Sequence, residues 1–238
     1  SQDETIEIIS TTYPETTLIS LDENKGATGA SNIGFTYALK QGADYILRLD
    51  SDTIVAQDFI KPLINKAKEN AMIGVVAPKI YYFDPPDEIW YAGSYRHPFH
   101  FGTIHGHRHE KDKPSNSESK EIDYAWGAAM LIKSEVLRAT GGFDTDFFVY
   151  YEEVDFCLRT KALGYSILFV PESKIWHKVG STANNAWTAF NWNMSKMLLY
   201  RKHSRNLFHL VALVAYAFAY ALISYLLYGK NSGNRGPI

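Results

Sequence analysis

The apolar residues in the first third of the chain alternate between the spacing of strands and the spacing of helices. A strand-like run covers residues 17–21, helical spacing covers 27–40 and 59–69, and strands are expected over 45–50 and 72–82. Strands that alternate with helices in this way favour a parallel sheet with helices packed on its faces. Ligands of such sheets bind beyond the carboxyl ends of the strands, so the residues that follow the 45–50 strand are the first candidates for a site.

Two aspartates, Asp50 and Asp52, stand at the end of that strand and are separated by one residue. Side chains at positions i and i+2 of a strand point to the same face, and two carboxylates on one face form a site for a hard divalent cation. Such a cation site is typical of proteins that bind phosphates. Asp and Ser are also ordinary turn residues, so an Asp-rich turn without a ligand is the alternative.

The composition indicates a globular chain with one large core. Its 238 residues are 46% hydrophobic, which is enough for one domain with an appendage. The formal net charge of −2 and the lack of a long basic run argue against nucleic acid as a partner. The single cysteine, Cys157, cannot form an internal disulfide, which fits a reducing compartment and a small buried residue.

The segment 207–228 is almost entirely apolar, and His209 is its only residue that ionises near neutral pH. A helix of this length just spans the core of a bilayer. Arg201 and Lys202 precede it, and tyrosines recur along it in the manner of interfacial anchors. We therefore expect residues 204–238 to form a membrane-associated or transmembrane helix and a tail. A buried helix, or one that lies in the membrane interface, is the alternative.

The middle of the chain is less regular. The expected elements are a strand over 89–95, a long polar loop over 97–121, a strand over 124–132 and a short helix over 134–140. His105, His107 and His109 alternate within the loop in a pattern that metal sites also use. No Cys or acidic strand end accompanies them, so a solvated loop is the simpler interpretation.

A second acidic cluster, Glu152, Glu153 and Asp155, follows an aromatic run and opens an expected helix. The helix dipole favours anions at this end, which would give all three a structural role. Carboxylates crowded against each other and against aromatic walls can also act as a base near neutral pH. Arg159 lies one helical turn beyond Asp155 and can pair with it, so these two are the more structural members.

A buried strand and a proline turn lead to His177. Neutral imidazole is a good ligand for divalent metals, so His177 is a candidate to complete the site that Asp52 begins. An isolated histidine most often has no such role.

Five motifs occur in order and together resemble family 2 glycosyltransferases of the inverting kind, especially the rhamnosyltransferase-like branch. They are NKGATGASN at 24–32, LDSDT at 49–53, GAAMLI at 127–132, GGFD at 141–144 and YYEEVDFCLR at 150–159. The resemblance covers nearly all of residues 1–203. It implies a GT-A fold, which is a Rossmann-like, mixed but mostly parallel α/β sheet flanked by helices, here followed by the hydrophobic C-terminal helix. The family's first strand and helix have no counterpart, so the nucleotide pocket is expected to be incomplete.

The resemblance also implies roles for individual residues. The donor would be bound by Asn24, Gly29, Asn32, Asp50 and Asp52, and the metal by Asp50, Asp52 and His177. The family's catalytic base is an Asp at the position of Glu153, whose extra methylene moves the carboxylate outward by on the order of 1.5 Å. Asp155 or Glu152 could share that role. Trp126, Gly127 and Trp90 are the candidates for binding the acceptor, although a tryptophan is more often part of a core.

The function implied is metal-dependent transfer of a sugar from a UDP- or dTDP-sugar, with Mg²⁺ or Mn²⁺, to a saccharide or lipid-linked acceptor in surface polysaccharide synthesis. The expected location is the cytoplasmic face of the cell membrane, peripheral or anchored by the C-terminal helix. One alternative is a non-catalytic glycan-binding or membrane-assembly module. Another is a haloacid-dehalogenase-like phosphatase, in which Asp50 would be the nucleophile and Asp52 the acid.

Overall fold

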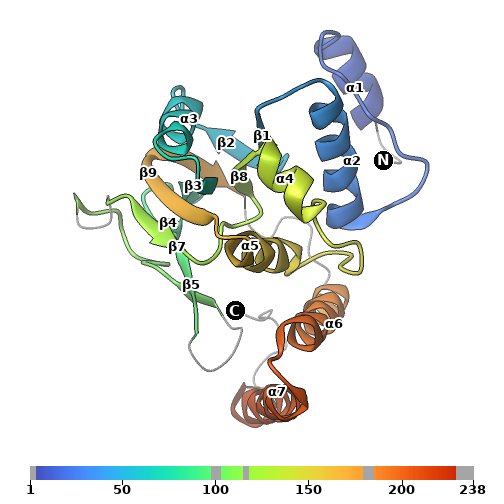
Figure 1. Cartoon of the computed structure of the whole chain (residues 1–238), viewed down its shortest axis with the longest axis vertical. Coiled ribbons are helices and arrows are strands. Elements are labelled where there is room, and N and C mark those ends of the chain that lie inside the picture. The colour runs from blue at the N-terminus through green and yellow to red at the C-terminus, as the bar shows by residue number, and fades with distance from the viewer. Residues whose placement is uncertain (1–3, 98–102, 115–117, 179–184, 229–238) are drawn as a thin grey trace.

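The computed structural model describes residues 4–97, 103–114, 118–178 and 185–228 (Figure 1). The helices are α1 (Thr5–Thr12), α2 (Gly26–Lys40), α3 (Ile60–Lys68), α4 (Ser134–Thr140), α5 (Glu152–Ala162), α6 (Asn185–His203) and α7 (Leu207–Tyr228). The strands are β1 (Tyr45–Leu49), β2 (Thr53–Val55), β3 (Ile73–Tyr82), β4 (Ile89–Tyr91), β5 (Ser94–Arg96), β6 (Thr103–His105), β7 (Lys120–Ile122), β8 (Ala129–Lys133) and β9 (Ser166–His177).

A mixed sheet of seven strands forms the centre of the molecule. Five of its strands follow the order β1-β8-β3-β9-β2, with β4 added beside β3 and β7 added beside β9. The long strands β3 and β9 pair in parallel, whereas the other pairings in the sheet are antiparallel. The prediction of a mixed α/β sheet flanked by helices is confirmed. The prediction that the sheet is mostly parallel is wrong.

The order of segments in the sequence does not predict the position of β8 in the sheet. Because β1 and β3 each pair antiparallel with β8, they run in the same direction, as the strand, helix, strand pattern predicts. They are not neighbours, however, because β8 comes from much later in the chain and lies between them. Local spacing reports the direction of successive strands but not a strand inserted from elsewhere.

The core lies on both faces of this sheet. All of β8 and nearly all of β3 are buried, which is why both read as continuous apolar runs rather than as alternating ones. Helix α3 packs on β3 and β9, and its inward face carries the buried side chains of Leu63 and Ala67, four residues apart. Helices α4 and α5 contact β8 and β9 respectively. Cys157 is fully buried on α5, as predicted.

Other local predictions differ from the structure. Residues 17–21 form no strand. The expected strand over 89–95 is divided into β4 and β5, because Gly93 adopts a left-handed φ of 91° that interrupts extended backbone. The expected loop over 97–121 contains β6 and begins β7, while parts of it fall outside the described residues. Strand β6 pairs with β5 in a separate two-stranded ribbon.

The two C-terminal helices, α6 and α7, contact each other and lie together at the lower edge of the view in Figure 1. The apolar segment 207–228 is helical, as predicted. Across the described part of the chain, however, no helix combines the length and apolarity needed to cross a membrane.

Candidate active site

The two aspartates Asp50 and Asp52 lie in the turn that joins β1 to β2, rather than on one face of a strand. These strands stand at opposite ends of the five-strand path. In a flat sheet about 19 Å would separate them, whereas the four peptide steps from Leu49 to Thr53 reach at most about 15 Å. The sheet therefore curves, and its curvature brings both edges to the acidic turn.

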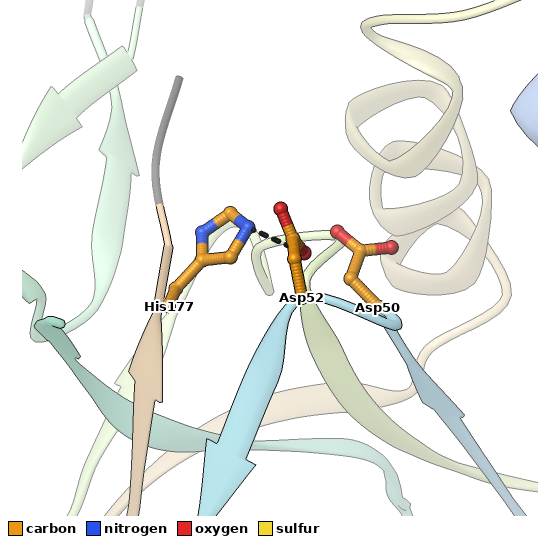
Figure 2. Close-up of side chains that lie close together, drawn as sticks. All are labelled: Asp50, Asp52 and His177. Atoms are coloured by element: carbon orange, nitrogen blue, oxygen red, sulfur yellow. Dashed lines mark hydrogen bonds and ion pairs between the residues drawn. The ribbon is translucent and has the colours of Figure 1, made fainter. Parts of the chain in front are cut away.

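His177 reaches the same turn at the end of β9. Strand β2 pairs antiparallel with β9, and this register sets Thr53 opposite His177. The backbone N–H of Lys178 donates to the carbonyl of Asp52 (3.0 Å), and His177 Nε2 lies 3.1 Å from Asp52 Oδ1. Figure 2 shows Asp50, Asp52 and His177 facing one another. One ligand atom from each lies within 4.8 Å of the others.

The chemistry of this donor set fits a divalent cation. Two carboxylates and a neutral imidazole are ligands that Mn²⁺ accepts, and carboxylates are preferred by Mg²⁺. The side chains of Asp50 and Asp52 are 35% and 38% exposed, while that of His177 is 12% exposed. His177 Nδ1 is buried without a hydrogen-bond partner, so Nε2 is the nitrogen that faces the aspartates. Because the two carboxylates are partly exposed, a cation held here would remain accessible to a further ligand.

Arg48, on β1, links the acidic turn to the second acidic cluster. Its Nη1 forms an ion pair with Asp50 Oδ1 at 2.9 Å, without the angle of a hydrogen bond. A Cβ atom on Gly127 would lie 3.2 Å from the same Nη1 and 3.8 Å from Cδ of Glu153. Gly127 is thus the point where the guanidinium and the Glu153 carboxyl converge, and a Cβ there would crowd the guanidinium while making an ordinary contact with the carboxyl.

The start of α5 buries Glu152 and leaves Glu153 half-buried, with its Oε2 atom shielded from solvent. Tyr150 and Tyr151, immediately before them, both have left-handed φ values, 66° and 65°. This conformation is uncommon for residues with a side chain and costs on the order of 1–3 kcal/mol at each position. The surrounding packing holds it, since Tyr151 is buried. The strained turn directs the two glutamates inward, where Oε2 of each has no hydrogen-bond partner.

Burial makes Glu153 a strong proton acceptor. Loss of hydration, and after it the charge of neighbouring Glu152, raise its pKa to about 8, while Arg48 opposes the increase. Burial also raises the pKa of Glu152, and Arg48 again opposes this. A carboxylate whose pKa lies near the working pH is suited to act as a general base. Of the three predicted candidates for the base, Glu153 is the one whose pKa is raised to about 8.

A small pocket opens beside Glu153. Its walls include Tyr124, Trp126, Tyr151 and Trp192 around the Glu153 carboxyl. The Trp192 ring, from α6, lies 4.9 Å from that of Tyr151. Aromatic walls around a single polar group are typical of pockets that bind small molecules.

Of the predicted acceptor residues, Trp126 lines this pocket and Trp90 stands behind it. The rings of Trp90 and Trp126 are 4.6 Å apart, and that of Trp90 is 4.8 Å from His177. Trp90 is only 6% exposed. The Trp90 ring therefore lies between His177 and Trp126, which belongs to the aromatic wall of the pocket.

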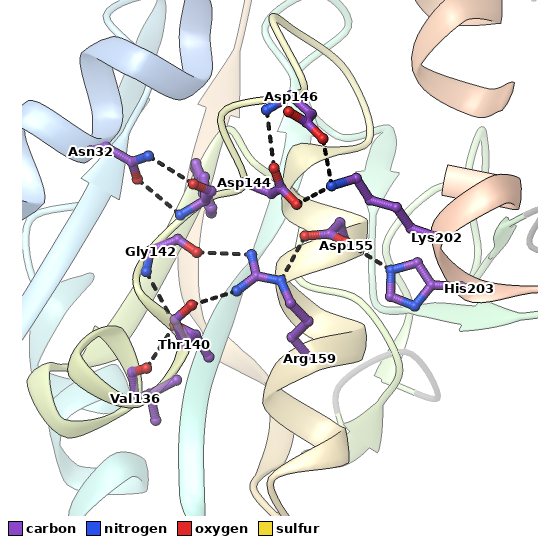
Figure 3. A network of polar contacts seen from close by, with 11 residues as sticks. Asn32, Val136, Thr140, Gly142, Asp144, Asp146, Asp155, Arg159, Lys202 and His203 are labelled. Atoms are coloured by element: carbon purple, nitrogen blue, oxygen red, sulfur yellow. Dashed lines mark hydrogen bonds and ion pairs between the residues drawn. The ribbon is translucent and has the colours of Figure 1, made fainter. Parts of the chain in front are cut away.

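Asp155 belongs to a polar network that holds the scaffold together. Arg159 Nε donates to its Oδ2 (2.8 Å), and His203 Nε2 lies 2.7 Å from its Oδ1 (Figure 3). Arg159 also donates to the carbonyls of Thr140 and Gly142. The Asp155 side chain is 2% exposed. Because both of its carboxylate oxygens have partners, Asp155 connects α6 to α5 and, through Arg159, to the turn after α4. Asp155 does not line the pocket beside Glu153.

We expect Asp155→Asn to destabilise the chain by about 2 kcal/mol, because Arg159 and His203 lose a buried anionic partner. Urea unfolding followed by circular dichroism measures this. The matched control is Asp146→Asn, whose carboxylate is 59% exposed and pairs with Lys202. It should change the free energy of unfolding by at most about 0.5 kcal/mol. Equal effects of the two substitutions would contradict the structural role of Asp155.

The residues of the 24–32 segment that were predicted to bind the nucleotide sugar make contacts that stabilise the backbone. Asn24 Oδ1 accepts from the N–H of Gly26, at the start of α2. Asn32 donates to the carbonyl of Phe143 and accepts from its N–H, so it joins α2 to the turn after α4. A Cβ on Gly29 would lie 2.6 Å from that of Lys25. These contacts give Asn24, Asn32 and Gly29 structural reasons for their identity, whatever they contact in a donor complex.

The alternating histidines do not converge on a metal position. His105 lies 2.9 Å from the Ser94 hydroxyl, His107 pairs with Glu110, and His109 pairs with Glu88. Within the described residues the one cluster with metal-ligand spacing is that of Asp50, Asp52 and His177.

Sequence reasoning missed Arg48, Tyr151 and Trp192. Arg48 carried a signal, because it is a lone charge inside an apolar strand next to the aspartates. Trp192 carried none, since its place in the pocket depends on where α6 packs.

The family model for glycosyl transferase family 2 matches residues 1–141. The dTDP-rhamnosyl transferase RfbF of Shigella flexneri is 27% identical over 164 residues, which cover 68% of this chain and 52% of that protein. The poly-β-1,6-N-acetyl-D-glucosamine synthase of Staphylococcus aureus strain COL is 26% identical over 170 residues, covering 71% of this chain and 38% of that protein. The chain thus spans about half the length of RfbF and less of the synthase.

Solved structures show the same fold. GalNAc-T7 with UDP, GalNAc and Mn²⁺ superposes with a TM-score of 0.58 at 16% identity, covering 74% of this chain and 35% of that chain. The mannosyltransferase PcManGT of Pyrobaculum calidifontis, with GDP-Man and Mn²⁺, gives 0.57 at 16% identity, covering 87% and 53%. These similarities confirm the GT-A fold expected from the sequence.

Proposed function

The chain belongs to glycosyl transferase family 2, and from this premise we propose that it transfers a sugar from a nucleotide-sugar donor to a hydroxyl of a saccharide or lipid-linked acceptor. The reaction is a direct displacement that inverts the anomeric carbon. The observation that carries the proposal is the position of Glu153, buried between Arg48 and an aromatic pocket, with the Asp50, Asp52 and His177 cluster beyond Arg48.

The Glu153 carboxylate takes the proton of the acceptor hydroxyl. The hydroxyl oxygen forms its bond to the anomeric carbon as the bond to the diphosphate oxygen breaks, and the nucleoside diphosphate leaves with the electron pair. Trp126 and Trp192 hold the acceptor ring against Glu153. Arg48 limits the pKa of Glu153 and keeps a positive charge next to Asp50.

Asp50, Asp52 and His177 are the residues that would hold a divalent cation. Such a cation supplies positive charge that stabilises a diphosphate leaving group. The donor is a UDP- or dTDP-sugar and the metal is Mn²⁺ or Mg²⁺. The names of RfbF and of the UDP and Mn²⁺ complex of GalNAc-T7 support these assignments. The name of the poly-β-1,6-N-acetyl-D-glucosamine synthase likewise supports a role in polysaccharide synthesis.

The test is a panel of UDP-, dTDP- and GDP-sugars, incubated with the chain and with Mn²⁺, Mg²⁺ or EDTA, and read as release of nucleoside diphosphate. We expect release from a UDP- or dTDP-sugar that depends on the metal and rises when a saccharide acceptor is added. Acceptor binding without release from any donor would instead favour a non-catalytic glycan-binding module. Hydrolysis of an aryl phosphate in place of a nucleotide sugar would favour the phosphatase alternative.

A further inference from the structure

The segment from Gly106 to Glu110 is a loop that lies beside Trp90 and is held by backbone hydrogen bonds. The N–H of Gly106 donates to the carbonyl of Gly93, and that of His109 donates to the carbonyl of Ile89. In return, the N–H of Ile89 donates to the carbonyl of Glu110. These bonds attach the loop to β4 and to the turn that follows it, so the side chain in the middle of the loop, Arg108, is presented by a fixed backbone.

The backbone on each side of Arg108 is strained. His107 and His109 both have left-handed φ values, 57° and 66°. Residues with a side chain adopt this region at a cost, and it persists where surrounding contacts impose it. Here the contacts are the hydrogen bonds to β4. The two turns direct Arg108 toward Trp90, and its Cζ lies 6.0 Å from the centre of the Trp90 ring.

Arg108 differs from its charged neighbours, because it has no anionic partner among the described residues. His107 pairs with Glu110, His109 with Glu88 and Lys111 with Asp87. Arg108 forms no ion pair with any residue that the structure describes, and its Nε is buried without an acceptor. Trp90 Nε1 is a second buried donor that has no acceptor among the residues the structure describes. Buried donors are nearly always satisfied, so two on adjacent side chains point to a missing oxygen-rich partner.

The position of Arg108 relates it to the acceptor side of the site. His105, from the same loop, packs against Trp126 with ring centres 5.1 Å apart. Burial and the nearby charge of Arg108 lower the pKa of His105 to about 4, which keeps this imidazole neutral. Arg108 therefore places a positive charge beside Trp90, whereas His105 adds none. The residue is half-buried, so its terminal nitrogens remain within reach of a ligand.

We propose that Arg108 recognises an anionic group, a phosphate or a carboxylate, on the acceptor. The proposal rests on the proposed function, because it takes the Trp126 pocket as the acceptor site. A guanidinium binds both anions through paired hydrogen bonds, and the nearby face of Trp90 favours its positive charge. Arg108 thereby selects acidic saccharides or phosphorylated acceptors over neutral ones.

The test measures binding without turnover, so it does not depend on whether a sugar is transferred. Methyl glucuronide, glucose 1-phosphate and neutral methyl glucoside are titrated into the chain by isothermal calorimetry. We expect at least one anionic probe to bind about tenfold or more tightly than the neutral probe. The two anionic arms distinguish a carboxylate from a phosphate. Arg108→Gln should reduce the preference to within about twofold, whereas Arg108→Lys should keep part of it.

The matched control is Lys113→Gln, which removes an exposed charge a few residues away and should leave the preference intact. Thermal unfolding checks that each variant folds. A wild-type chain that binds neutral and anionic probes equally would overturn the proposal, as would an Arg108→Gln variant that keeps the preference. A further titration with UDP and Mn²⁺ tests whether Arg108 binds the nucleotide instead of the acceptor. If Arg108→Gln weakens nucleotide binding alone, Arg108 serves the donor and the proposal fails.

Discussion

Glu153→Gln is expected to reduce the rate of sugar transfer by about 10²–10⁴-fold, because the amide cannot accept the proton of the acceptor hydroxyl. The substitution preserves shape, and it removes a buried carboxylate whose Oε2 has no partner. The fold should therefore remain intact. Release of nucleoside diphosphate under saturating donor and acceptor measures the rate.

The control for this substitution is Glu172→Gln, which changes an exposed glutamate on β9. Its transfer rate should equal that of the wild type. If Glu153→Gln turned over like the control, Glu153 would not be the base.

The same residue predicts a pH dependence. Glu153 acts as a base only when deprotonated, and its pKa is raised to about 8. The kcat/KM of the wild type should therefore rise as pH increases toward about 8 and level off above it. Glu153→Gln should lack this inflection in its residual activity. An inflection near the ordinary carboxyl range would contradict the assignment.

The stability of the chain should move in the opposite direction. Below pH 4.5, the ordinary value for this group, Glu153 is protonated in both the native and the unfolded chain. Between 4.5 and about 8 only the native chain holds the proton, so the free energy of unfolding falls as pH rises through this window. Urea unfolding at pH 5 and pH 8 should show a smaller fall for Glu153→Gln than for the wild type.

Asp52→Ala should have the second largest effect, because it removes a carboxylate of the proposed cation site and the partner of His177. A bound cation contributes several kcal/mol to transition-state stabilisation, so we expect transfer to fall by about 10²–10³-fold. Mn²⁺ titration followed by electron paramagnetic resonance should show weakened binding in the same variant. This second readout reports on the site itself and requires no turnover.

Asp58→Asn is the matched control for Asp52→Ala. Asp58 is exposed and lies only six residues further along the chain, so its loss tests whether a nearby negative charge is sufficient to attract Mn²⁺. The control should bind Mn²⁺ and transfer sugar like the wild type. Normal Mn²⁺ binding by Asp52→Ala would remove Asp52 from the cation site.

Helices were largely predictable from sequence because they depend on local spacing. The helices expected over 27–40, 59–69 and 134–140 agree with the structure to within a residue. The predictions of strands failed where pairing with a distant segment decides whether and where a strand forms. Residues 17–21 have strand-like composition but no strand beside them to complete a ladder, and β8 enters the sheet from far along the chain. Strand pairing depends on such partners and cannot be read from a single segment.

The sequence alone determined the chemical groups of the candidate site, because the order and spacing of the LDSDT and YYEEVDFCLR motifs are properties of the chain. It also determined that Arg159 can reach Asp155, since both lie on one turn of one helix. Tertiary structure alone decided which of these groups meet. His177 reaches Asp52 across 125 residues only because β9 pairs with β2. Glu153 and Arg48 converge over Gly127 only because β8 lies beside β1. Pairing between strands that are far apart in the sequence sets the distances between these side chains, and the local spacing of apolar residues does not predict that pairing.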